Sequence, residues 1–275
     1  MNAAPEDQAA LWNGIAGRMW VESQALLDQA FHPLEALLLE EVRVAGARQV
    51  LDIGCGTGAT TLAIARQLGG QGRCVGVDIS RPMIEAARER ASGTHAGFVC
   101  ADAQSQRFDA GAFDLVVSRF GVMFFDDPVR AFANLRSALR PGGALRALAW
   151  RGAAENPFMT TAERAAAPLL TLPPRAPGGP GQFAFADPDQ VRRILQDSGW
   201  SDIELRPVEV SCRFPARQLP DYLERLGPLG RVLQQMEEAE RHRIVAAVRP
   251  AFEPFLQGQY VCFTATCWML CAEAP

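Results

Sequence analysis

The residues of this chain that could do chemistry are concentrated in one glycine-rich segment, Val50-Leu51-Asp52-Ile53-Gly54-Cys55-Gly56-Thr57-Gly58. Glycines allow the backbone to turn tightly and allow a ligand to approach without a Cβ atom in the way. Asp52 precedes the first glycine by two positions, where a carboxylate repels a pyrophosphate and attracts a cation. With Ala59, the glycines also fit the dinucleotide pattern GxGxx(G/A), so an NAD(P) site stays open at this point.

Two further carboxylates follow predicted strands. Asp78 lies 20 residues after Gly58, at a position suited to holding ribose hydroxyls, whereas Ser80 is the better candidate for capping the helix that follows. Asp102 stands in Ala101-Asp102-Ala103 after the next strand. The pair Asp126-Asp127 precedes a proline, which is typical of a helix cap, and no metal site is predicted.

Strands and helices must alternate to position these residues, and from residue 48 onward they do. Apolar spacing near 3.6 over residues 9–45 predicts two helices divided at Pro33. The alternation loosens at residues 151–187, and a helical segment at 218–256 separates the last two strands. Alternating elements indicate a parallel sheet with helices on both faces. The strands are predicted at residues 49–53, 73–77, 97–101, 113–118, 144–150, 203–214 and 260–270.

The composition excludes several classes of protein. The chain has 275 residues and a net charge of −4, and all 27 of its basic residues are arginine, so a catalytic lysine is impossible. The absence of a basic run argues against a nucleic-acid partner. No apolar stretch is long enough for a membrane span. Seven cysteines without a CxxC pair, and no signal-peptide pattern, lead us to expect a cytoplasmic protein.

Taken together, the motifs at the ends of successive strands resemble those of class I S-adenosylmethionine-dependent methyltransferases. The similarity is greatest to the branch of the ubiquinone/menaquinone-biosynthesis C-methyltransferases and covers residues 45–150. It implies an α/β fold with a doubly wound, seven-stranded, mostly parallel sheet of Rossmann-like type, its last strand antiparallel. A helical cap is expected at residues 1–45, and a methyltransferase domain at 46–275 with a helical lid at about 216–257.

The resemblance implies S-adenosylmethionine as cofactor and S-adenosylhomocysteine as product. Asp52 is expected to pair with the ligand's amino group, directly or through water, and Asp102 to meet the adenine amino group. Trp20 is expected to stack near the cation, although burial in the core is an equal alternative for it. The expected cofactor contacts are Trp20, Asp52, Gly54, Cys55, Gly56, Gly58, Asp78, Ile79, Met83, Ala101, Asp102, Ala103, Ser118, Arg119 and Phe120.

Apolar residues around the mouth of the predicted sheet indicate a small, largely apolar acceptor that is aromatic, isoprenoid or polyketide-like, methylated at C, O or N. For each of these aromatic residues, simple core packing is the alternative. His32 is a weak candidate for a general base, and transfer without a base is equally open. A non-methylating rearrangement and NAD(P)-dependent oxidation are the alternative functions, and the protein is expected to be a monomer or homodimer. The expected acceptor contacts are Phe124, Trp150, Asn156, Phe158 and Tyr222.

Overall fold

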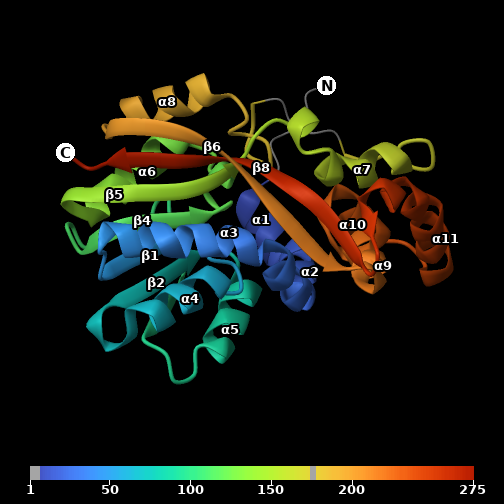
Figure 1. Ribbon diagram of the computed structural model, residues 1–275, viewed down its shortest axis with the longest axis horizontal. Helices are drawn as coiled ribbons and strands as arrows, with labels where there is room; N and C mark the ends of the chain where they lie inside the picture. The colour runs from blue at the N-terminus through green and yellow to red at the C-terminus, as the bar shows by residue number, and fades with distance from the viewer. Residues whose placement is uncertain (1–6, 174–177) are drawn as a thin grey trace.

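A single mixed sheet runs through the computed structural model, which describes residues 7–173 and 178–275 (Figure 1). Its strands are β1 (Gln49–Ile53), β2 (Arg73–Asp78), β3 (Ala96–Cys100), β4 (Phe113–Arg119), β5 (Leu139–Trp150), β6 (Ser201–Pro215), β7 (Leu256–Gln257) and β8 (Tyr260–Glu273). They lie in the order β3-β2-β1-β4-β5-β8-β6, with β7 paired to β8. Strands β1 to β5 are parallel, and β8 is antiparallel to β5 and β6. The predicted α/β fold is confirmed, and the short β7 adds an eighth strand to the expected seven.

Helices cover both faces of the sheet. They are α1 (Gln8–Asn13), α2 (Ile15–Glu22), α3 (Gln24–Ala45), α4 (Ala59–Leu68), α5 (Arg81–Arg90), α6 (Pro128–Ala138), α7 (Pro157–Ala166), α8 (Pro188–Asp197), α9 (Leu219–Arg225), α10 (Gly227–Leu233) and α11 (Glu238–Val248). Helices α3 and α4 share a buried apolar cluster with Val50 and Leu115 of the sheet, whereas α6 packs against β5 and α8 packs against β6. Because both faces are covered, the central strands consist of almost continuous apolar residues.

The N-terminal region, which we call the cap, differs from the two helices expected. It contains three helices, interrupted at Gly14 and Ser23, and Pro33 lies inside α3 without dividing it. Pro33 removes one backbone hydrogen bond, but Leu34 and Leu38 on the same helix are 0% exposed. Packing of this apolar face therefore keeps the helix continuous across the proline. Residues 1–6 of the expected cap lie outside the described residues.

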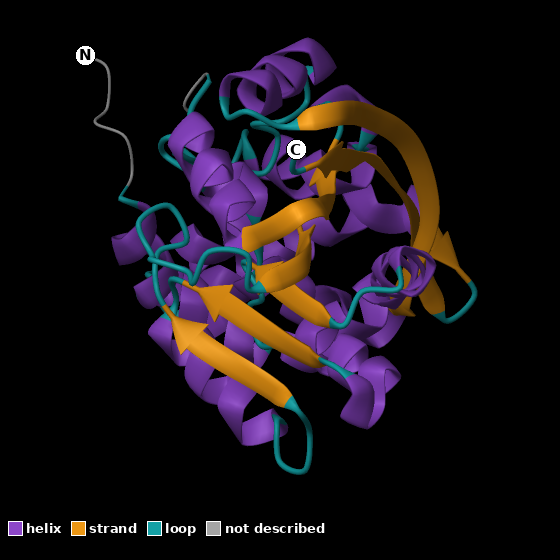
Figure 2. Ribbon diagram, turned by 90° about the vertical axis from the view of Figure 1, so that its left-hand side faces the viewer, coloured by secondary structure: helices purple, strands orange, loops and turns teal. Residues whose placement is uncertain are grey.

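Two long strands carry the helices α9 to α11 away from the rest of the sheet. β6 and β8 pair from Ser201 and Glu273 at one end to Pro215 and Tyr260 at the other, and Figure 2 shows the long curve of this ribbon. The helices α9 to α11 lie at its far end, beside α7 (Figure 1). They fall within residues 216–257, where a lid was expected, and we call them the lid. Helix α7 was not predicted.

None of the helices in the two described ranges is both long and apolar enough to cross a membrane.

Candidate active site

The glycine-rich loop between β1 and α4 has the backbone that its sequence predicts. Gly54, Gly56 and Gly58 have φ angles of 64°, 55° and 85°, in the left-handed region that favours glycine. The loop is fixed to the next strand because Gly54 and Cys55 donate their backbone N–H groups to the Val77 carbonyl, at 2.8 and 3.2 Å. Its position at the carboxyl ends of the parallel strands is where ligands bind in open α/β sheets.

Gly121 is a residue of this site that the sequence reasoning missed. A Cβ atom on Gly54 would lie 2.5 Å from the Gly121 Cα, and one on Gly121 would lie 2.5 Å from the Ile53 carbonyl oxygen. The loop after β4 therefore crosses the glycine-rich loop backbone against backbone. The available signal was a glycine directly after a predicted strand, in Phe120-Gly121-Val122.

Asp78 connects the glycine-rich loop to the end of β2. One carboxylate oxygen accepts the Gly56 N–H and the other accepts the Ser80 N–H, both at 2.8 Å. The residue is 8% exposed, and burial raises the pKa of its carboxyl group while these N–H donors lower it. Each oxygen retains acceptor capacity beyond its backbone partner, so the carboxylate can still accept hydroxyl groups from a ligand.

Asp52 points toward the helix that follows the loop. Its carboxylate accepts a hydrogen bond of 2.6 Å from the Thr61 hydroxyl of α4, and the residue is 1% exposed. Burial raises the pKa of this carboxyl to about 7, against the opposing effects of the Thr61 hydrogen bond and the nearby Arg119 guanidinium. Pairing of Asp52 with a ligand's amino group stays a prediction.

The cap places aromatic side chains over the glycine-rich loop. A Cβ atom on Gly56 would lie 3.6 Å from the Trp20 Nε1 atom and 3.7 Å from the Met83 sulfur. Trp12 makes edge contacts with Trp20 at 5.8 Å and with Phe124 at 5.2 Å between ring centroids. The structure therefore brings Trp20 of α2 and Met83 of α5 to Gly56, and Trp12 connects Trp20 to Phe124.

The segment after β3 lies next to Asp78. Ala101 donates its N–H to the Asp78 carbonyl at 3.0 Å, and the Asp102 carboxylate accepts the Gln104 N–H at 2.9 Å. Asn134 of α6 donates to the Ala103 carbonyl at 2.8 Å. The predicted Ala101-Asp102-Ala103 contact is thus held beside the end of β2. The predicted contact Ile79 follows Asp78 in the chain, and its carbonyl accepts a hydrogen bond of 3.0 Å from the Asn13 side-chain amide of the cap.

The three predicted residues at the end of β4 make different contacts. The Ser118 hydroxyl donates to the Ile53 carbonyl at 2.7 Å and accepts the Gly121 N–H at 3.1 Å, so its bonds support the loop crossing. Arg119 lies 4.0 Å from Glu35 of α3. Phe120 has a φ of 70° and stacks on Trp150, with 4.4 Å between centroids and 10° between planes.

The expected acceptor contacts fall in separate places. Trp150 packs with Phe120, and Phe124 with a tryptophan of the cap. Phe158 lies under the lid, 5.3 Å from Tyr222, where burial raises the pKa of the tyrosine hydroxyl. The Asn156 side chain forms hydrogen bonds of 2.9 Å with both the backbone N–H and the carbonyl of Thr266, so these bonds have a structural role.

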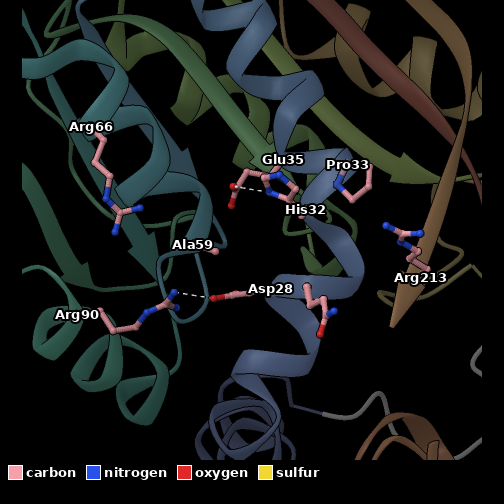
Figure 3. Close-up of a pocket in the computed structure, with 9 residues that line it drawn as sticks. Asp28, His32, Pro33, Glu35, Ala59, Arg66, Arg90 and Arg213 are labelled. Atoms are coloured by element: carbon pink, nitrogen blue, oxygen red, sulfur yellow. Dashed lines mark hydrogen bonds and ion pairs between the residues drawn. The ribbon is translucent and has the colours of Figure 1, made fainter. Parts of the chain in front are cut away.

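His32 does not lie among these aromatic residues. Its side chain is 71% exposed and 3.5 Å from Glu35, and it lines a groove of about 510 Å³ between α3 and α4 (Figure 3). Within the described part of the chain, no group of three or more histidine, cysteine or acidic residues could hold a metal ion.

Comparisons with known proteins match the fold and the position of this loop. Residues 50–143 match the family model described as a methyltransferase domain. The chain is 36% identical over 118 residues to the aklanonic acid methyltransferase DauC of Streptomyces sp. (strain C5), covering 42% of this chain and 54% of that protein. It is 29% identical over 174 residues to the demethylmenaquinone methyltransferase of Roseiflexus castenholzii, covering 58% of this chain and 71% of that protein.

Among solved structures, the [4+2]-cyclase SpnF has a TM-score of 0.56 with 20% identity, and the match covers 100% of this chain and 99% of that one. This likeness establishes a common fold. The chain spans about half the length of DauC.

Proposed function

Because the chain belongs to the S-adenosylmethionine-dependent methyltransferases, we propose that it transfers the methyl group of this cofactor to a small, largely apolar acceptor. The acceptor is an aromatic, isoprenoid or polyketide-like compound, methylated at C, O or N. The observation that carries this proposal is the loop after β4. There, Gly121 touches the glycine-rich loop while its neighbour Phe120 stacks on Trp150. A cofactor on one loop and a flat apolar ligand on the adjoining aromatic wall would be neighbours.

The residues at this edge of the sheet fit the cofactor. Gly56 leaves open the space that a side chain would take, beneath the Trp20 ring and the Met83 sulfur. Asp78 would accept the ribose hydroxyls, Asp102 would accept the adenine amino group, and the electron-rich face of Trp20 suits a sulfonium cation. The bound cofactor supplies an electrophilic methyl group on a sulfur that leaves as a neutral thioether.

The contribution of the chain to the reaction is mainly to position the acceptor and to exclude water. The half-buried Phe120 presents the aromatic surface, and Trp150, which is 3% exposed, holds that surface in place by stacking on it. The raised pKa of Tyr222 keeps its hydroxyl protonated at neutral pH, so it is suited to hydrogen bonding rather than to removing a proton. We therefore propose an acceptor that brings an acidic hydroxyl or an activated carbon and needs no strong base.

Activity can be tested with methyl-labelled cofactor and a panel of hydroxylated aromatics, quinones and isoprenoids, with products identified by mass spectrometry. The expected result is a product that carries the label and that, with unlabelled cofactor, is 14 Da heavier than one acceptor, the mass of a methyl group replacing a hydrogen. Trp150→Ala should raise the KM of that acceptor about tenfold or more while the cofactor Kd changes little.

Two other results would replace this function. Cofactor-dependent formation of an isomer without a gain in mass would identify a rearrangement. Binding of NAD(H) but not of S-adenosylmethionine in calorimetry would identify a dinucleotide enzyme.

A further inference from the structure

Arg90, the last residue of α5, joins the glycine-rich loop to the cap. One terminal nitrogen of its guanidinium donates to the Thr57 carbonyl at 2.7 Å and contacts the Thr57 hydroxyl at 3.3 Å. The other donates to the Asp28 carboxylate of α3 at 2.6 Å (Figure 3). We infer that Arg90 is a positioning residue that fixes the loop in its binding shape and, through Asp28, holds the cap over it. This inference rests on the proposed function of the loop.

The contact acts on the most adaptable part of the loop. Thr57 stands between Gly56 and Gly58, two residues with positive φ and without side chains that would restrict the backbone. Thr57 itself is 5% exposed, so its carbonyl needs a partner within the protein. The Arg90 guanidinium is that partner, and it comes from outside the loop. Its hydrogen bond therefore fixes Thr57, in addition to the bonds that hold Gly54, Cys55 and Gly56.

The same contact restrains the cap beside an open groove. Beside Asp28, the groove of about 510 Å³ separates α3 from α4. The Asp28–Arg90 pair lies at the end of this groove that is nearest the glycine-rich loop (Figure 3). A second attachment lies at α1, where the Asn13 side chain accepts the Arg81 N–H at 2.9 Å. Trp20, which covers Gly56, lies on the chain between the two attachments.

Arginine suits this task because its planar fork can direct hydrogen bonds to two partners at once. The Arg90 and Asp28 side chains are 28% and 25% exposed, so solvent screens their interaction less than that of a surface pair. A lysine at position 90 would keep the charge but would present one nitrogen in place of the fork. Charge alone would therefore not restore the function of Arg90.

The test compares Arg90→Lys and Asp28→Asn with the control Glu40→Gln. Glu40 forms an exposed pair with Arg43 on the same helix, and among the described residues this is its only ion pair. Both test variants should raise the Kd of S-adenosylmethionine about tenfold, through faster dissociation, while kcat at saturating cofactor changes less than about twofold. The control should bind like the wild type. A double variant should show the effects of the two single changes as non-additive.

Hydrogen exchange of the ligand-free protein gives a readout that needs no cofactor. Amides of residues 54–58 and of α2 should exchange faster in both test variants than in the control. Unchanged exchange and Kd in both variants, or a wild-type Kd in Arg90→Lys, would overturn the inference. If the wild type itself does not bind the cofactor, the proposed function fails, and the exchange of the variants still decides whether Arg90 and Asp28 restrain the loop and the cap.

Discussion

At the scale of single residues, the site depends on Gly54 and Gly121, the two glycines at which the loops after β1 and β4 cross. Gly121 has a φ of −77°, which suits any residue, so the requirement for glycine there comes from space alone. A Cβ atom would meet the Ile53 carbonyl oxygen at 2.5 Å and the Gly54 Cα at 2.6 Å. Both neighbours are backbone and cannot move aside independently. Glycine at this position is therefore a consequence of how the two loops meet.

Gly121→Ala should lower the free energy of unfolding by about 1–3 kcal/mol, because the two loops must separate to admit the new carbon atom. Denaturant titration measures this loss, and it should be accompanied by weaker cofactor binding. Gly70→Ala is the matched control, since a Cβ atom there meets nothing within 4 Å. Equal stability of the two variants would show that the loops do not cross as described.

The raised pKa of the Asp52 carboxyl predicts that the free energy of unfolding depends on pH. Its folded pKa of about 7 lies above the value near 3.9 of an unfolded chain. The folded protein therefore binds more protons between these values. The stability that Asp52 contributes is full below about pH 4 and is lost as the pH rises through 7.

Asp52→Asn removes this titration and keeps an oxygen that can accept the Thr61 hydroxyl. Between pH 5 and pH 8, the stability of the variant should rise relative to the wild type, by at most about 1.4 kcal/mol per unit of pH. Urea unfolding of both proteins at four pH values measures the difference. Parallel curves would mean that Asp52 is ionised throughout.

Residue types at the site could be predicted from the sequence more readily than their partners. The glycines and the carboxylates at the strand ends were found from spacing, and Asp78 does lie against Gly56. Nothing in the spacing indicated that Asp52 would turn to Thr61, or that Arg90 would reach Asp28, 62 positions away. Such contacts depend on how distant elements pack, which local patterns do not encode.

At the scale of elements, the strands were predicted best, because a buried parallel strand is a short apolar run between turn residues. The bounds of β1 agree with the prediction. The cap was predicted less well, since the sequence pattern predicts a break at Pro33 that the structure does not have. Local propensity at a proline was outweighed by burial of the α3 face that includes Leu34 and Leu38. Helix α7 begins shortly after β5, in a stretch whose turn residues predict loop rather than helix.

Pro33→Ala should raise the free energy of unfolding by about 1–3 kcal/mol. The change restores a backbone N–H four residues after the Gln29 carbonyl, and α3 is already helical on both sides of this position. Thermal unfolding measures the gain. Gln29→Ala is the control, because it changes an exposed side chain on the same helix and should shift stability by less than about 0.5 kcal/mol. A destabilised Pro33→Ala would indicate that a bend at the proline is needed.

At the scale of the whole molecule, hydrogen bonds between residues far apart in the sequence attach α7, which lies beside the lid, to β8 of the sheet. Asn156 and Thr266 are 110 positions apart, yet the Asn156 amide satisfies both backbone groups of Thr266 on β8. Asn156 is 1% exposed, so no water could easily replace it. The acceptor role expected for this residue stays a prediction, whereas its hydrogen bonds hold the start of α7 to β8.

Asn156→Ala should cost about 1–3 kcal/mol in unfolding free energy, because it leaves the buried Thr266 N–H without this partner, whereas the Thr266 carbonyl keeps the Arg151 N–H. Thr160→Ala, on the same helix, removes only a peripheral hydrogen bond to the Pro157 carbonyl and should be nearly neutral. Denaturant titration of both variants separates them. A stable Asn156→Ala with a raised acceptor KM would instead favour direct contact with the acceptor.

The ribbon of β6 and β8 has a consequence for how this protein could diversify. Pro215 and Tyr260 are paired neighbours, so the chain leaves the sheet and returns to it at one place. Exposed parts of the segment between them can change in length or sequence while its two ends stay joined by the same strand pair. The glycine-rich loop lies on other strands. Exchange of residues 216–259 between relatives should therefore transfer acceptor preference as a cassette, with cofactor binding inherited from the recipient.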